Sequence, residues 1–367
     1  MSQPEPAPTV PPAKTIDWWR VGETLALGFG GGIALGLTGF PAGWMSGAIL
    51  AVSVAALAGR QVQMPTALTR VTFALTGISM GATVTPETVA GMANWPISLV
   101  ILAVAVIALT AAVAVYLRMV HGWEPGSALL GAFPGAMATT LILAVQYKAD
   151  VRAIAIVQTV RVVAIAVLLP TAIAVMGLSG SPVTVATISP LDRPFELAIL
   201  VVVSVAAAYV TQLLRFPGGL IFGSMTASAI LHGTGLIHVS LPRWLTIATF
   251  MMLGSLVGTR FAGTSLATLR HLASAAFGAL LVSATVAFAA AFLAAWILGR
   301  DVGTLVIAYA PGALDAMMIL ALALNLEPAF VGAHHLARFL LVLLSMPIIV
   351  KLMQRLRKSD TPPGDSQ

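Results

Sequence analysis

Long apolar runs divide the chain, and short polar or charged stretches separate them. A membrane-spanning helix needs about 20 consecutive apolar residues, and about twelve runs come near that length. The predicted spans are 21–39, 42–59, 66–84, 95–117, 127–147, 152–176, 195–213, 217–235, 243–261, 272–298, 303–325 and 328–350. The pattern predicts an all-α polytopic membrane protein with about 10 to 12 transmembrane helices, twelve being the preferred count. Spans 95–117 and 272–298 are almost purely apolar, so we expect them to face lipid.

Two of the predicted spans, 127–147 and 303–325, contain a Pro-Gly pair well inside their length. The pairs are Pro134-Gly135 and Pro311-Gly312, which lie 177 positions apart. Proline lacks the N–H that a helix needs and clashes with the preceding turn, so each pair should break its helix inside the membrane. The backbone groups that a break frees are tolerated only where protein or a water-filled cavity meets them. A plain proline kink that serves packing is the alternative.

The same offset of 177 relates further residues along the two halves. Pro65, Gly77, Gly81, Arg161 and Pro170 recur as Pro242, Gly254, Gly258, Arg338 and Pro347. We therefore predict two homologous membrane repeats, against the alternative of coincidence in a Gly- and Ala-rich chain. The predicted parts are a disordered tail at 1–18, repeat 1 at 19–176, a linker at 177–194, repeat 2 at 195–352 and a basic, polar tail at 353–367. Six spans per repeat would make the repeats parallel, and an odd number would make them inverted.

Composition agrees with this organisation. The chain is 59% hydrophobic and 9% charged, whereas a soluble domain carries about 25% charged residues. With twelve spans, eleven of the 19 lysines and arginines fall on the side of the N-terminus and five on the other side. This bias predicts that both termini are cytoplasmic. Cysteine is absent, so disulfides, thiol catalysis and cysteine-bound metals are excluded.

Three charged residues lie within or beside the interrupted spans. Asp315 follows Pro311 by four residues, and Arg161 and Arg338 occupy matching places in the span after each break. An arginine at helix centre costs roughly 2.5–3.5 kcal/mol on insertion scales, so each should face the interior and find a partner. We expect Asp315 to pair with Arg338.

Arg161 has no matching acid, because Ala138 stands where the second copy has aspartate. Backbone carbonyls, Thr139, Thr140, Asp315 or an anionic ligand remain as its partners. The surplus arginine favours an anionic solute. The alternative is a structural salt bridge with a spare arginine bound to carbonyls of the broken helix.

Histidines and glycines offer further candidates. His334 and His335 precede Arg338 by one helical turn and would form a proton relay with Asp315, although neutral residues near the membrane surface are the preferred interpretation. The other histidines are scattered, so we predict no metal site and no cofactor. Gly77-x-x-x-Gly81 and Gly254-x-x-x-Gly258 favour close helix packing, with a homodimer contact as the lesser alternative.

Four motifs carry a resemblance to a known family. They are Phe40-Pro41-x-Gly43-Trp44-Met45-x-Gly47, Phe216-Pro217-Gly218-Gly219-x-x-x-Gly223, Phe133-Pro134-Gly135 and Ala310-Pro311-Gly312-x-x-Asp315. With the duplication across residues 20–355, they resemble the AbrB family of duplicated bacterial membrane proteins. An unrelated soluble DNA-binding regulator shares that name, but its small β-rich fold is incompatible with this apolar chain.

Members of the AbrB family carry two labels, regulator of gene expression and, provisionally, ammonia monooxygenase. A monooxygenase needs a redox metal or a flavin, and the sequence shows no ligand cluster, so no catalytic residue is assigned. A direct transcription factor needs a basic soluble reader, and no soluble stretch is long enough for one, so we expect no direct nucleic-acid binding. The resemblance implies at most an indirect effect on gene expression.

The preferred hypothesis is a secondary transporter or sensor of a small solute or ion in the bacterial inner membrane. Asp315 would be the protonatable or cation-binding group, Arg161 and Arg338 the counter-charges or anion anchors, and the two Pro-Gly breaks the rest of the pocket. The first alternative is a membrane regulator that acts through a protein partner without transport. An enzyme is the third and disfavoured hypothesis.

Overall fold

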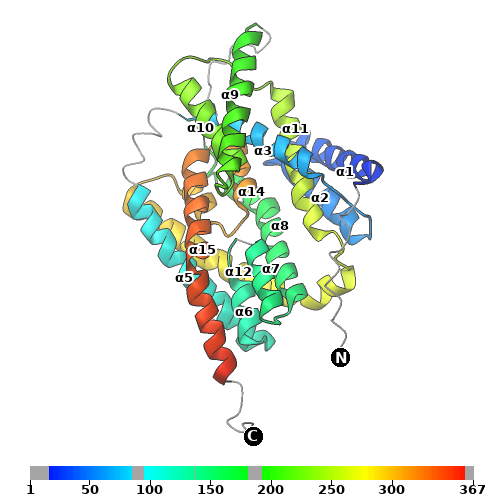
Figure 1. Ribbon diagram of the computed structural model, residues 1–367, viewed down its shortest axis with the longest axis vertical. Helices are drawn as coiled ribbons and strands as arrows, with labels where there is room; N and C mark the ends of the chain where they lie inside the picture. Colours follow the sequence, from blue (N-terminus) through cyan, green and yellow to red (C-terminus); the bar gives the residue numbers. More distant parts are fainter. Residues whose placement is uncertain (1–15, 85–94, 136, 181–191, 360–367) are drawn as a thin grey trace, which may run out of the picture.

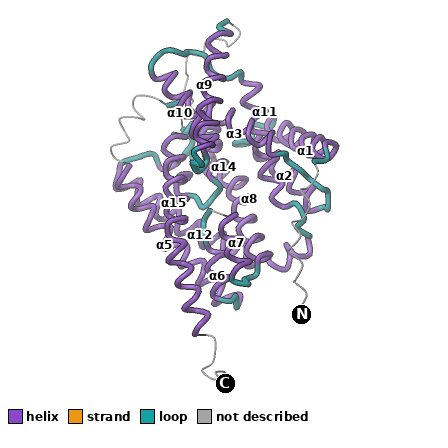
Figure 2. Tube along the Cα trace, in the orientation of Figure 1, coloured by secondary structure: helices purple, strands orange, loops and turns teal. Residues whose placement is uncertain are grey.

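The computed structural model describes residues 16–84, 95–135, 137–180 and 192–359. Over these ranges the chain is helical and contains no strand (Figure 2). The prediction of an all-α fold is therefore confirmed. The predicted N-terminal tail and the linker between the repeats lie mostly outside the described residues.

The helices follow the predicted apolar runs closely. They are α1 (Trp18–Gly36), α2 (Gly43–Leu57), α3 (Thr66–Gly81), α5 (Trp95–His121), α6 (Pro125–Ala132), α7 (Met137–Gln146), α8 (Val151–Val175), α9 (Pro194–Leu213), α10 (Gly219–Gly233), α11 (Arg243–Gly258), the 3₁₀ turn η2 (Thr259–Phe261), α12 (Leu266–Leu298), α13 (Val302–Tyr309), α14 (Leu314–Ala323) and α15 (Pro328–Ser359). Helix α15 continues past residue 353, where the sequence predicts the start of the C-terminal tail.

Six of the described helices are long and apolar enough to cross a membrane. They are α5, α8, α9, α11 with its 3₁₀ turn, α12 and α15 up to Met346. These helices indicate a polytopic membrane protein, while the count of twelve stays a prediction. The two spans with Pro-Gly pairs fall short because each is divided into helices of 8 and 10 residues.

Polar side chains fix the start of several helices. Asp17, Asp150, Ser265 and Asp301 each accept a hydrogen bond from a backbone N–H two or three residues further on. Such a cap satisfies one of the donors that the first turn of a helix leaves free. The observed starts of α1, α8 and α13 lie within three residues of the predicted ones. Helix α12 begins at Leu266, six residues before the predicted start, because Ser265 caps it there.

Small residues bring helices of the two halves into close contact. A Cβ added to Gly77 in α3 would lie 2.3 Å from the carbonyl oxygen of Ile221 in α10. A Cβ on Gly254 in α11 would lie 2.5 Å from the carbonyl oxygen of Met45 in α2. Because both neighbours are backbone atoms, only glycine permits these distances. The small-xxx-small spacing therefore serves packing within the chain, which was the preferred interpretation.

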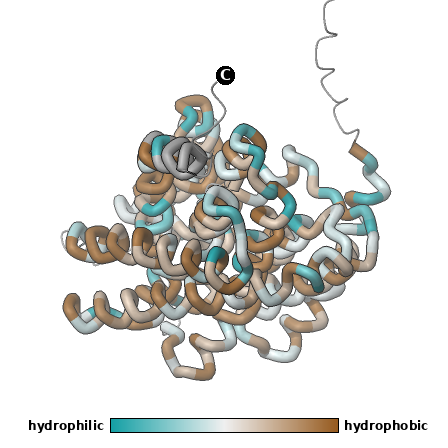
Figure 3. Tube along the Cα trace, turned by 90° about the horizontal axis from the view of Figure 1, so that it is seen from below, coloured by the Kyte–Doolittle hydropathy of each residue, from teal (hydrophilic) through white to brown (hydrophobic). Residues whose placement is uncertain are grey.

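Burial separates the central helices from the peripheral ones. In Figure 1, α9, α10 and α11 lie near α1–α3 in the upper part, and α5, α6 and α7 lie in the lower part. The apolar window of α8 is 78% buried, against 39% in α5 and 33% in α12. Side chains such as Val100, Val104, Leu281 and Phe292 are exposed on α5 and α12, and Figure 3 shows hydrophobic residues along the outer helices. Helix α8, which carries Arg161, is thus a central element.

Candidate functional site

The helix is interrupted at both Pro-Gly pairs. Between α6 and α7, Phe133 adopts an extended conformation and Gly135 has a φ of +94°, a value that favours glycine. Between α13 and α14, Ala310 is extended with φ −53° and ψ 133°. Both breaks are held inside the protein, since Pro134 and Pro311 are buried. Each break leaves carbonyl groups at the end of a short helix without their usual partners.

At the first break, Arg161 binds the freed carbonyl groups. Its Nη1 donates to the carbonyl oxygen of Ala132 at 3.2 Å, and its Nη2 donates to that of Phe133 at 2.5 Å. The side chain is fully buried, and its Nε has no hydrogen-bond partner among the described residues. Gln158, one turn earlier in α8, donates to the carbonyl oxygen of Leu130 at 3.0 Å. Helix α8 thus caps the carboxyl end of α6.

At the second break, Arg338 also binds two carbonyl groups, one of them at the matching position, and it makes one further contact. Its Nη1 donates to the carbonyl oxygen of Ala310 at 2.5 Å, and its Nη2 donates to that of Gly312 at 2.6 Å. Nη2 also lies 2.7 Å from Nδ1 of His335, whose Nε2 is 2.9 Å from the carbonyl oxygen of Ile307. A ring that donates through Nε2 and accepts through Nδ1 is neutral. His335 therefore extends the cap that Arg338 forms on α13.

The expected pairing of Asp315 with Arg338 is wrong. Among the described residues, Asp315 forms its ion pair with Arg260, whose Nη2 lies 3.8 Å from Oδ1 of Asp315. Arg260 belongs to η2, at the end of α11. The break itself explains the difference, because the carbonyl oxygens of Ala310 and Gly312 serve Arg338 in place of a carboxylate.

Two arginines thus lie in the interior with carbonyl groups as acceptors, and no ion pair joins either to a carboxylate in the described parts of the chain. Arg161 is 1% exposed and Arg338 is 3% exposed. Each arginine therefore brings a positive charge to its break that no carboxylate balances in the described residues.

Comparison with known proteins places the chain in a family. Residues 44–354 match the family described as "Transition state regulatory protein AbrB". The chain belongs to the AbrB family. It is 30% identical over 321 residues to "Putative regulator AbrB" of Escherichia coli (strain K12), covering 85% of this chain and 90% of that protein. It is 25% identical over 359 residues to "Uncharacterized protein YhjN" of Bacillus subtilis (strain 168), covering 90% and 92%. No solved structure matches the chain.

In this AbrB-family protein, His334 joins a second buried network. Its Nδ1 lies 2.8 Å from the carbonyl oxygen of Phe330, and its Nε2 lies 2.8 Å from Oγ of Ser98. The hydroxyl of Tyr309, the last residue of α13, donates to the carbonyl oxygen of Ser98 at 2.6 Å. His334 and His335 are both buried within the protein. No hydrogen bond joins either histidine to Asp315 in the described residues, so the geometry provides no direct relay between them.

The predicted threonines differ in their surroundings. Thr139 is half-buried. Thr140 is fully buried, and its Oγ1 has no hydrogen-bond partner within the described ranges. A buried hydroxyl without a partner costs free energy, so it is a candidate for binding a ligand. Neither threonine forms a hydrogen bond with Arg161 among the described contacts.

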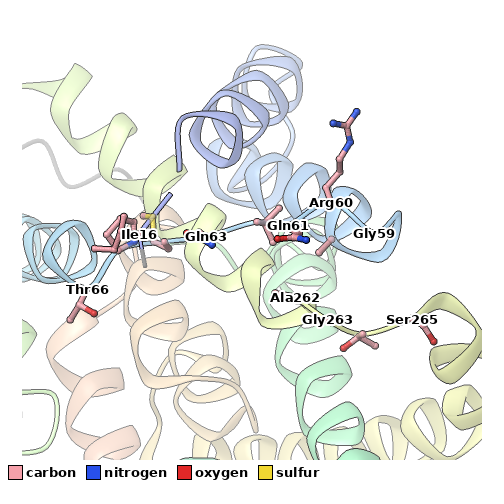
Figure 4. A pocket seen from close by; sticks show the side chains of 14 residues that line it. Ile16, Gly59, Arg60, Gln61, Gln63, Thr66, Ala262, Gly263 and Ser265 are labelled. Carbon is pink, nitrogen blue, oxygen red and sulfur yellow. The ribbon is translucent and has the colours of Figure 1, made fainter. Parts of the chain in front are cut away.

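Two cavities of the AbrB-family protein lie away from the breaks. One of about 810 Å³ opens between the α2–α3 loop and the turn after η2, lined by residues that include Gln61, Gln63 and Ser265 (Figure 4). Another of about 400 Å³ lies between α9 and α10 and is mostly apolar. Within the described residues, no group of three His, Asp or Glu side chains is placed to hold a metal ion.

Sequence reasoning missed three residues that the structure places at the breaks. Arg260 lies at the end of the predicted span 243–261, where nothing in the sequence indicates its contact with Asp315. Ser98 and Tyr309 looked like ordinary members of spans. The only available signal was polarity, since a serine and a tyrosine hydroxyl inside a buried helix need a partner.

Proposed function

We propose that this AbrB-family protein is an inner-membrane secondary transporter whose small solute binds between its two broken helices. Paired broken helices in matching places of a duplicated chain are the strongest sequence indication of a transporter binding site. Irregular backbone at membrane depth is tolerated where it is buried in protein or lines a cavity. Both breaks here are buried, and both are capped by an arginine of the following helix.

The buried arginines are the observation that carries this proposal. A kink made only for packing leaves little need for a guanidinium group, since small residues or water can satisfy the freed carbonyls. Each arginine costs roughly 2.5–3.5 kcal/mol at helix centre on insertion scales, and intramembrane charges usually mark solute or ion pathways. Two such residues at matching places support a binding site over two independent kinks.

Asp315 is the coupling group in this proposal. Its ion pair with Arg260 is long at 3.8 Å, and the two side chains are 13% and 28% exposed. Such a pair can open, so the carboxylate can bind a proton or a cation and release it. A tight, dry pair would not serve this purpose, because separating its charges would cost too much.

Topology completes the proposal. Two homologous repeats, about twelve membrane-crossing segments and cytoplasmic termini are supported by the offset of 177 residues and by the distribution of lysine and arginine. A regulatory effect would then follow indirectly from the solute that is moved or sensed.

The name of the Escherichia coli relative favours a second function. In that case the protein is a membrane regulator that acts through a protein partner, without transport. Lys351 of α15 is exposed near the carboxyl end of the chain, so its positive charge is available to a protein partner.

Charge movement in liposomes tests the proposal. Purified protein would receive jumps in ammonium, amines, small carboxylates, Na⁺ or pH. We expect a solute-dependent current in the wild type and its loss in Asp315→Asn, because the amide cannot take up a proton or hold a cation. Asp192→Asn is the matched control, since Asp192 is exposed before α9. No current from folded, inserted wild type would contradict electrogenic transport and favour the regulator or an electroneutral carrier.

A further inference from the structure

We propose that the solute of this site is a small oxyanion, such as a carboxylate, sulfate or phosphate, bound at the first break by Arg161. The inference rests on the proposed function and names its substrate class. Oxyanions suit guanidinium groups because their oxygen atoms match the fork of N–H donors.

The balance of charge at the breaks favours an anion. The carboxyl ends of α6 and α13 and the amino ends of α7 and α14 meet the breaks, so their partial charges of about −0.5 and +0.5 cancel. Asp315 is neutralised by Arg260. The positive charges of Arg161 and Arg338 remain, since their described partners are carbonyl groups and, for Arg338, a neutral histidine. These charges would repel an ammonium ion and attract an oxyanion.

Two unused hydrogen-bond donors belong to the residues around the first break. Arg161 Nε and Thr140 Oγ1 are buried and lack partners among the described residues. Several other buried hydroxyl groups also lack a partner, but Arg161 carries the one buried, unpartnered donor on a charged side chain among the described residues.

The repeat indicates that Thr140 faces the first break. The residue 177 positions later is Met317, whose sulfur would lie 2.7 Å from a Cβ added to Gly312. A methionine therefore fills the space beside the second break. The smaller Thr140 leaves space in the matching place, and a Cβ added to Gly135 meets no atom within 4 Å. The first break thus combines space with free donors.

A purely structural role for Arg161 explains less. Capping the carbonyl groups of Ala132 and Phe133 accounts for two of its nitrogen atoms. It leaves Nε buried and unpaired, and it does not explain a second unpaired donor one helix away in α7. An oxyanion satisfies both donors together.

Anion binding to purified protein in detergent tests the inference. The probes are sodium acetate, succinate, sulfate and phosphate, with sodium chloride and ammonium chloride at equal ionic strength. A ligand that binds only the folded state raises the melting temperature. We expect at least one oxyanion to raise Tm in a saturable way and ammonium chloride to have no such effect, with the Kd measured by titration calorimetry.

Thr140→Val is the decisive variant, because removing an unpaired hydroxyl should not harm folding. We expect it to weaken oxyanion binding by about tenfold or more, the usual worth of a hydrogen bond to a charged group. Thr76→Val is the matched control, since Thr76 also has a buried, unpartnered hydroxyl but lies in α3. Its Kd should equal that of the wild type. Arg161→Met should abolish oxyanion binding. If Arg161→Met fails to fold, the Kd of Thr140→Val still tests the inference.

The outcomes separate this inference from the proposed function. Oxyanion binding without any solute current would support the inference and indicate a sensor or an electroneutral carrier. A current driven only by ammonium or amines would support the proposed transport function and overturn the inference. Stabilisation by no oxyanion, or equal binding by Thr140→Val and Thr76→Val, would also overturn it.

Discussion

The two breaks share an extended residue before the proline, but they differ at the glycine, since Gly135 has a positive φ and Gly312 does not, and they differ in what surrounds them. At the second break, Arg338 donates to two carbonyl oxygens and to His335, and Met317 packs against Gly312. At the first break, Arg161 donates to two carbonyl oxygens and keeps an unpaired Nε. Space adjoins Gly135 there, and the hydroxyl of Thr140 has no partner in the described residues.

This difference suits the two breaks to distinct roles. The second break is packed and hydrogen-bonded, which suits a fixed support. The first break holds unused donors beside open space, which suits a ligand.

The largest expected effect comes from removing each arginine. Arg338→Met loses three hydrogen bonds and leaves acceptors buried, so it should reduce the free energy of unfolding by about 3 kcal/mol. Arg161→Met loses two hydrogen bonds but also removes an unpaired donor, so it should cost only about 1 kcal/mol. Unfolding of both variants in the same detergent measures the difference.

His335→Leu provides the control for that comparison. It removes one contact of Arg338 without removing the guanidinium group, so its cost should lie between those of the two arginine variants. Equal destabilisation by Arg161→Met and Arg338→Met would contradict the distinction between the two breaks.

A smaller effect should distinguish the two glycines. Gly135→Ala places a Cβ on a residue with φ of +94°, which should cost about 1–2 kcal/mol in backbone strain whatever its neighbours are. Gly312→Ala places a Cβ against the sulfur of Met317. Its cost should therefore fall in the Met317→Ala background by about 0.5–1 kcal/mol in a double-mutant cycle. Gly135→Ala should show no such coupling with Thr140→Ala.

Sequence reasoning located the breaks because their signals are rare residues in apolar runs. Proline and arginine inside a span leave few structural options, so Pro134, Pro311, Arg161 and Arg338 could be singled out. The fold class followed from the same apolar runs, and most helix bounds agreed within a few residues.

The contacts of these residues were harder to predict. The partner of Arg338 is the main-chain carbonyl of a broken helix, and main-chain acceptors have no residue type to identify them in a sequence. Asp315 meets Arg260 because α14 lies near the end of α11, a tertiary contact that local patterns do not contain. The assigned roles of the site residues and the repeat itself stay predictions.

Labelling of single cysteines measures the difference between the breaks most directly. The natural chain has no cysteine, so Thr139→Cys and Ala316→Cys each supply one reactive group at matching places 177 residues apart. Thr139 is half-buried and Ala316 is fully buried. In proteoliposomes, a water-soluble thiol reagent should label Thr139→Cys faster than Ala316→Cys, and a bound oxyanion should slow the first reaction alone. Equal rates, or faster labelling of Ala316→Cys, would contradict the claim that the first break is the open one.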